Sequence, residues 1–310
     1  MIINSLDSFP FVLLQWFPRN RKWQLLYLVY RWILALYFLC WFVVILMNAF
    51  SYIKWKYLIY ISNWSFLIWL AYLVFSAISL TLKSLWQLGM VNDRVSKPSY
   101  YCYCQTRKIT YRPCSDCDCK DCVGQDSSCQ MPRSCSIMDK IQWPLFTVGT
   151  EFAVAITLLY WTLFYEPHSK QNFFSIDSLH IHLINGVLAF VDLWVSGVPV
   201  RIYHALHSVL FAVSYVVFTG VYYAAGGTDP TGNSSIYPFL NYKSNPGSAV
   251  GLGIACALVL MTSIHLLFYL QFLIRNWITC YIQKRFYGQN KVIQCRRGSL
   301  EHSLHLELPL

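Results

Sequence analysis

A serine and a histidine in two apolar stretches of the chain have the placement that a nucleophile and its general base require. Ser62 and His182 each lie about one helical turn after the start of their stretch. If both stretches cross the membrane in the same direction, the two residues lie at a similar depth. A histidine that takes the serine proton makes the hydroxyl a nucleophile for ester cleavage. Asn185, one turn from His182, can orient the imidazole or hold an oxyanion. These residue types also serve in helix packing inside membranes, so both interpretations stay open.

The histidine belongs to a polar stripe on residues 179–201. At about 100° per residue, His182, Asn185, Asp192 and Ser196 fall on one face of a helix. A charged side chain such as Asp192 costs about 2.5–3.5 kcal/mol near the centre of a bilayer on insertion scales. We therefore expect the stripe to face other helices or a water-filled cavity.

Three charged residues predict a second polar layer deeper in the same bundle. Glu151 and Asp192 lie at similar depth in two apolar stretches, and Arg31 lies near the end of another. Two carboxylates at one depth need a cation or a shared proton. The pattern predicts a structural ion-pair layer of Arg31, Glu151 and Asp192, which His265 is placed to join. The alternative is the proton or ion pathway of a transporter.

The elements that position these residues are membrane helices. Of the 310 residues, 56% are hydrophobic and only 12% are charged, against about 25% charged in soluble domains. The net charge of +10 comes from dispersed Lys and Arg, which does not suggest a nucleic-acid partner. The predicted fold is all-α, a polytopic six-transmembrane-helix bundle in the lipid bilayer. Its spans are residues 28–49, 57–82, 144–165, 179–199, 202–225 and 249–274.

The Lys and Arg residues outside the spans predict the orientation. Of the 24 in the chain, 19 lie on the side of the N-terminus and four on the other side, which favours both termini in the cytosol. The sequon at Asn233 then lies in the last outer loop, where a glycan can be added. The predicted segments are a cytosolic N-terminal segment (1–27), helices one and two (28–82), a cytosolic Cys-rich loop (83–143), helices three to six (144–274) and a basic cytosolic tail (275–310).

The Cys-rich loop holds eight of the 12 cysteines, including two CxxC units. Cys114 with Cys117, and Cys119 with Cys122, are spaced as zinc ligands. Only Asp118 separates the units, so a cluster of several metal ions fits better than a finger. Three interpretations stay open: reduced thiols, some of them palmitoylated, a metal site, or disulfides. Beyond this zinc, no cofactor is predicted.

Several motifs together resemble the rolling stone family. They are YRWILAL from Tyr30, KYLIYISNW from Lys56, LYWT from Leu159, His182 and Asn185 with Asp192, PVR from Pro199 with His204, and YAAGGTD from Tyr223. The resemblance implies a multi-pass protein of the plasma membrane or a secretory-pathway membrane, with a part in myoblast fusion. It implies no reaction.

A more distant similarity runs to the androgen-inducible family of membrane hydrolases, whose threonine and histidine cleave fatty-acid esters of hydroxy fatty acids. His182 precedes Asp192 by ten residues, as the histidine of that family precedes an acidic residue. Ile59 stands at the threonine's position, and Ser62 follows three residues later. We therefore predict a cell-surface process such as cell fusion or adhesion. A lipid ester hydrolase and a transporter are the alternatives, with a lipid substrate or a partner membrane protein as binding partner.

Overall fold

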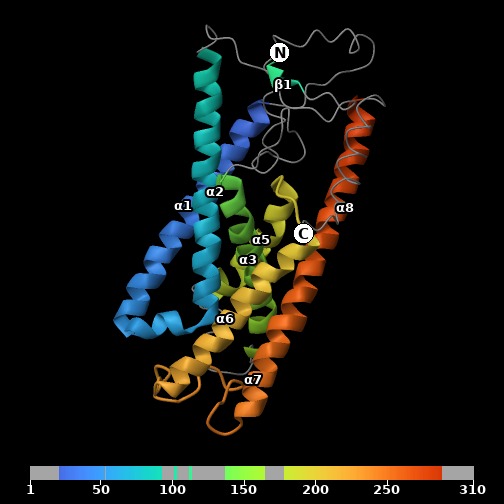
Figure 1. Cartoon of the computed structure of the whole chain (residues 1–310). Coiled ribbons are helices and arrows are strands. Elements are labelled where there is room, and N and C mark those ends of the chain that lie inside the picture. The colour runs from blue at the N-terminus through green and yellow to red at the C-terminus, as the bar shows by residue number, and fades with distance from the viewer. Residues whose placement is uncertain are drawn as a thin grey trace.

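The computed structural model describes residues 21–52, 54–92, 101–102, 112–113, 137–164 and 178–287, and these are almost entirely helical (Figure 1). One short antiparallel pairing joins β1 (Tyr101–Cys102) to β2 (Arg112–Pro113). The helical elements are α1 (Arg21–Tyr52), η2 (Lys54–Ile59), α2 (Ile61–Asn92), α3 (Ile137–Leu159), η5 (Tyr160–Phe164), η6 (Leu179–Ile184), α5 (Asn185–Val195), η7 (Ile202–His204), α6 (Ala205–Ala224), α7 (Pro246–Ala255), η8 (Cys256–Leu260) and α8 (Met261–Tyr287).

Among the described residues, five helical segments are long and apolar enough to cross a membrane. They are Gln24–Ala49, Ile61–Leu85, Lys140–Thr162, Ile202–Ala224 and Pro246–Thr279, which correspond to five of the six predicted spans. The remaining predicted span is a shorter apolar helix, Leu179–Val195. At 1.5 Å per residue it is about 26 Å long, less than the hydrocarbon thickness of about 30 Å. The all-helical fold is confirmed, whereas six full spans stay a prediction.

The short helix ends because its backbone turns at Ser196. That residue adopts an extended conformation (φ −81°, ψ 154°), and Pro199 follows three residues later, where its ring and missing N–H cannot continue a helix. The chain runs extended to Arg201 and then enters α6 through η7. The fourth and fifth predicted spans are therefore separate helices.

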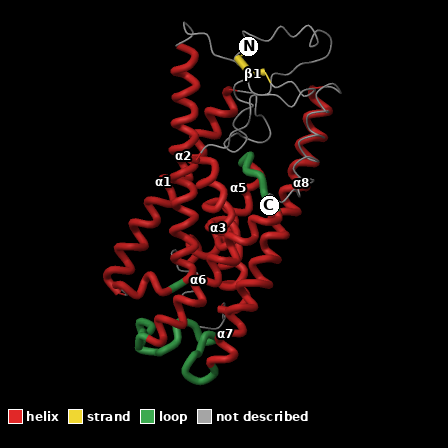
Figure 2. The backbone as a smooth tube through the Cα atoms, in the orientation of Figure 1, coloured by secondary structure: helices red, strands yellow, loops and turns green. Residues whose placement is uncertain are grey.

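The helices run alternately up and down, so that their ends gather at two faces of the bundle (Figure 1). We call one face the loop end. It holds the connection 54–60 between α1 and α2, and the loop 225–245 after α6 (Figure 2). The opposite face holds the last turn of α2 and the first turn of α3. At this face the helices extend beyond the apolar stretches. Helix α2 continues to Asn92 and α3 begins at Ile137, and both of these ends lie inside the segment 83–143 that was predicted as a loop.

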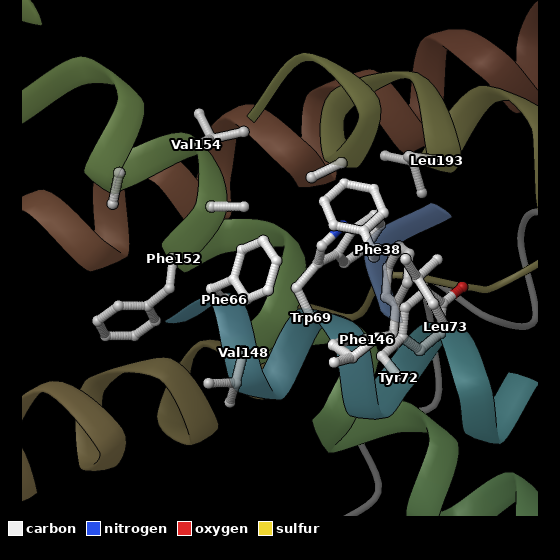
Figure 3. Packing of buried hydrophobic residues seen from close by; sticks show 14 of the residues in the cluster. Phe38, Phe66, Trp69, Tyr72, Leu73, Phe146, Val148, Phe152, Val154 and Leu193 are labelled. Atoms are coloured by element: carbon white, nitrogen blue, oxygen red, sulfur yellow. The ribbon is translucent and has the colours of Figure 1, made fainter. Parts of the chain in front are cut away.

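Helix α3 is the centre of the bundle and packs against α2, α5, α6 and α8. Phe146 and Phe152 of α3 meet Phe38 of α1 and Phe66 and Trp69 of α2 in one buried cluster (Figure 3). The outward faces are apolar as well, as Met47 and Val259 show with 67% of each side chain exposed. Such surfaces would aggregate in water, but lipid solvates them.

Small residues let the central helices approach one another closely. A Cβ built on Gly149 would lie 3.2 Å from the Trp69 Cα, so α3 nearly touches the α2 backbone. A Cβ built on Gly186 would overlap the Thr157 hydroxyl and lie 3.0 Å from the Ala153 carbonyl oxygen. Glycine at position 186 therefore sets the distance between α5 and α3.

This close approach predicts the effect of adding one methyl group. We expect Gly186→Ala to lower the free energy of unfolding by about 1–3 kcal/mol, the usual cost of overpacking a filled site. The matched control is Gly220→Ala on α6, because no atom lies within 4 Å of the added carbon, and alanine favours helix. Thermal unfolding of the purified protein in detergent measures both. Equal unfolding temperatures for the two variants would contradict the packing argument.

Candidate functional site

A buried ion pair joins three helices near the middle of the bundle. Arg31 Nη1 lies 2.7 Å from Asp192 Oδ1, and both side chains are fully buried. Tyr72 donates its hydroxyl to Asp192 Oδ2 at 2.9 Å, and Arg31 donates to Tyr27 at 2.8 Å and to Tyr72 at 3.1 Å. The charge of Asp192 on α5 is thus compensated by α1 and α2 together.

Tyr27 and Tyr72 complete the surroundings of the ion pair, and the sequence alone assigned neither of them to it. Both hydroxyls accept hydrogen bonds from the buried guanidinium. The spacing of Tyr27 and Arg31 by four residues was a usable signal, since such residues meet on one helix face. Nothing local in the sequence pairs Tyr72 with Asp192.

Glu151 belongs to a separate polar network, so Arg31, Glu151 and Asp192 do not form one triad. Glu151 Oε1 lies 2.7 Å from His265 Nδ1, and Ser208 donates to Glu151 Oε2 at 2.6 Å. His265 Nε2 lies 3.0 Å from the Arg201 carbonyl oxygen. Because a carbonyl only accepts hydrogen bonds, Nε2 carries a proton. The second proton is then shared between His265 Nδ1 and Glu151, and the pair is neutral overall wherever that proton resides.

Arg275 is a third buried cation, which the sequence reasoning assigned to the basic tail. It is 1% exposed and donates to the carbonyls of Leu193 (2.5 Å), Ser196 (2.7 Å) and Val198 (3.2 Å). These carbonyls lie at and just beyond the end of α5, where helical partners run out. Arg275 of α8 therefore caps the short helix and complements the negative end of its dipole.

The ion pair also sets the register between α2 and the segment that holds His182. Tyr72 and Asp192 are hydrogen-bonded, and Ser62 and His182 each lie ten residues nearer the loop end. The two helices run in the same direction, so Ser62 and His182 lie at a similar level, about 15 Å from the ion pair.

At that level His182 contacts an aromatic ring rather than the serine. Its imidazole stacks on Tyr160, with ring centroids 3.8 Å apart and planes 9° apart. Both rings lie in π-helical segments, η5 and η6, a rare geometry that recurs at functional sites. No hydrogen bond joins Ser62 to His182 in the described part of the chain.

Several buried polar atoms around His182 have no hydrogen-bond partner among the described residues. They include His182 Nδ1, both amide atoms of Asn185, and Ser65 Oγ. Asn185 and Ser65 are fully buried. Unsatisfied groups of this kind cost about 1–3 kcal/mol each, so each calls for a partner such as a water molecule, an ion or a bound ligand. Ser196 Oγ, at the opposite end of the polar stripe, also has no hydrogen-bond partner among the described residues, so unpaired polar atoms occur at both ends of the stripe.

The structure describes the predicted glycan site but not the predicted metal site. Cys114, Cys117, Cys119 and Cys122 lie outside the described residues, so their zinc site stays a prediction. Within the described ranges, no group of three or more His, Cys, Asp or Glu is placed to hold a metal ion. Asn233 is exposed at the loop end.

Comparison with known proteins gives one consistent match. A family model described as Protein rolling stone matches residues 112–283, more than half of the chain. The protein rolling stone of Drosophila melanogaster is 28% identical over 243 residues, which cover 78% of this chain and 76% of that protein. No solved structure matches the chain.

The ion pair predicts a specific pattern of destabilisation. Either Arg31→Met or Asp192→Leu alone should lower the free energy of unfolding by about 3–5 kcal/mol, because each leaves a buried charge without its partner. The double variant should lose less than either single one, since it leaves neither charge. Thermal unfolding of the four proteins in detergent completes the double-mutant cycle. Penalties that simply add in the double variant would mean that the two residues are energetically independent.

Proposed function

The chain belongs to the rolling stone family, and from this premise we propose that it acts at the cell surface in a membrane process such as cell fusion or adhesion. It is an integral multi-pass membrane protein, as its apolar helices and its family membership agree. In this proposal both termini lie in the cytosol and the loop end faces outward. The excess of Lys and Arg on the side of the termini supports this orientation.

The observation that carries the proposal is the ordered loop 225–245 at the loop end. Its 21 residues precede α7, and loops this long without helix or strand are usually functional. The Tyr222 hydroxyl donates to the Thr228 carbonyl at 2.9 Å, and the Thr219 and Tyr242 hydroxyls are 2.8 Å apart. The Ile61 amide donates to the Tyr237 hydroxyl. A loop held at both ends presents a defined surface, which suits recognition of a partner on another membrane.

A tight turn stabilises the tip of this loop. Asp229 Oδ1 accepts hydrogen bonds from the backbone amides of Thr231 (2.9 Å) and Asn233 (2.7 Å). Desolvation raises the pKa of the Asp229 carboxyl, but the hydrogen bonds from Thr231 and Asn233 together outweigh it and lower the pKa below its ordinary value. The ionised carboxylate therefore stabilises the turn above the pKa of the unfolded chain, and this stabilisation disappears as pH falls through the lower folded pKa.

A lipid ester hydrolase is the second candidate function, which the level of Ser62 and His182 favours. In this reaction Ser62 attacks the ester carbonyl carbon and His182 takes its proton, then donates that proton to the leaving alcohol. Asn185 has an unpaired amide one turn away, suited to an oxyanion. The reaction requires the His182 ring to leave the face of Tyr160 and reach the serine hydroxyl.

A transporter function receives the least support from the geometry. Asp192 is paired with Arg31 and Glu151 with His265, so both carboxylates that would carry an ion are already compensated. Transporter sites also use pairs of broken helices at the membrane midplane. The carboxylates of this protein are better explained as elements of helix packing.

The adhesion proposal is tested by loosening the outer loop without touching the bundle. We expect Asp229→Ala to abolish aggregation of suspension cells that express the full chain, because the turn loses its two backbone hydrogen bonds. Lys243→Gln, an exposed change in the same loop, is the control and should retain aggregation. Sensitivity of Asn233 to an N-glycosidase on intact cells reports that the loop faces outward. Aggregation that is equal in both variants at equal surface level would refute the proposal.

The hydrolase candidate is tested with a fluorophosphonate probe on the purified protein. If Ser62 is the nucleophile, labelling is lost in Ser62→Ala, which removes the hydroxyl. It is also lost in His182→Ala, because the serine hydroxyl needs a general base to become nucleophilic. Ser65→Ala removes a buried serine one turn away and should retain the label. A label that survives Ser62→Ala, or no label on the unmodified protein, excludes this serine as nucleophile.

A further inference from the structure

An apolar groove lies between α2 and α6, close to the loop end and away from the polar stripe. Its volume is about 590 Å³, within the range of about 300–1,000 Å³ typical of small-molecule sites. Its walls come from η2, α2 and α6 and are almost wholly apolar, formed chiefly by Leu58, Trp64, Leu67, Phe211, Phe218 and Tyr222.

Trp64 of α2 lines the groove and contacts residues of η2 and α6. Its indole Nε1 donates to the Leu58 carbonyl at 2.6 Å. Its ring lies 5.1 Å from the Phe218 ring and 6.0 Å from the Phe211 ring, measured between centroids. From Phe211 to Tyr222 the groove follows α6 for about 16 Å. This length and direction suit an extended hydrocarbon chain that lies parallel to the helices.

The groove opens onto a surface that faces lipid. Leu210, Val217 and Val221 of α6 are about 60% exposed, and these side chains lie within a segment long and apolar enough to cross a membrane. Molecules that reach the groove from this side are membrane lipids. An acyl chain gains no hydrophobic energy by moving there from the bilayer, so selectivity has to come from shape and from a polar headgroup.

Lys56 supplies a cation at the mouth of the groove. Its ammonium donates to Thr228 Oγ1 at 2.9 Å and to the Asp229 carbonyl at 2.7 Å, and the groove residue Tyr222 donates to the carbonyl of the same threonine. An ammonium has three donors, so one remains for a ligand. No carboxylate in the described ranges forms an ion pair with Lys56, and its charge is therefore available.

We propose that this groove binds a phospholipid, with one acyl chain lying on Trp64 between α2 and α6 and the phosphate bound by Lys56. The chain fills the apolar groove along α6, and the headgroup lies at the loop end beside Thr228. From the membrane side, the bound lipid would link the segment 54–60 to the loop 225–245. This site is separate from the Ser62 and His182 pair, and it meets the loop of the adhesion proposal at Thr228 and Asp229.

The test measures lipid retained by the full chain in detergent, counted by native mass spectrometry. The probes are phosphatidylglycerol and diacylglycerol with the same two acyl chains. We expect phosphatidylglycerol to be retained, and Lys56→Gln to reduce its retention by roughly fivefold, the effect of one lysine near a membrane surface. Glutamine keeps a donor for Thr228, so the loop is preserved. Lys243→Gln removes an exposed lysine of the loop and should change nothing.

A second pair of variants tests the position of the acyl chain. Leu67→Trp fills the groove and should abolish retention of phosphatidylglycerol, whereas Leu210→Trp, on the lipid-facing side of α6, should retain it. Three results would overturn the proposal: equal retention by the two lysine variants, equal retention by the two tryptophan variants, or retention of diacylglycerol as strong as that of phosphatidylglycerol.

Discussion

The contact between Arg31 and Asp192 is the interaction on which the rest of the bundle depends. Either charge alone would be costly in the interior of a membrane protein. Together, with Tyr27 and Tyr72 as hydrogen-bond partners, they form a satisfied unit. Since the members come from α1, α2 and α5, their meeting determines how these three helices are ordered, and at which level each one lies.

The short helix α5 shows how polar contacts replace length. At 17 residues with η6 it is shorter than the other membrane helices, yet it lies beside α3 in the centre of the bundle. Asp192 attaches it to α1 and α2, Arg275 caps its end from α8, and Gly186 allows it to approach α3. Asp192, the charged residue that would make this helix costly in lipid, is also the residue that attaches it to the neighbouring helices.

The polar interior contains paired charges in its middle and uncharged polar groups toward the loop end. The charges of Asp192 and Glu151 are paired with groups from other helices, which suits a structural role. Toward the loop end, the imidazole of His182 and the amide of Asn185 keep unpaired atoms. The ordered loop and the groove beside Lys56 lie at the same end. Recognition or reaction at this protein is therefore expected where the interior, the lipid and the outer surface come together.

The amino-acid sequence by itself determined the helical class, five membrane-length helices, the break near Pro199 and the polar face of residues 182–196. These follow from apolar length and from the periodicity of one helix. Only the tertiary structure decided the partners: Asp192 with Arg31 and Tyr72, Glu151 with His265, His182 with Tyr160, and Arg275 with the end of α5. Periodicity gives the face and the depth of a residue, but a partner depends on which helices become neighbours and how each is rotated. That choice is made by the packing of all the helices at once.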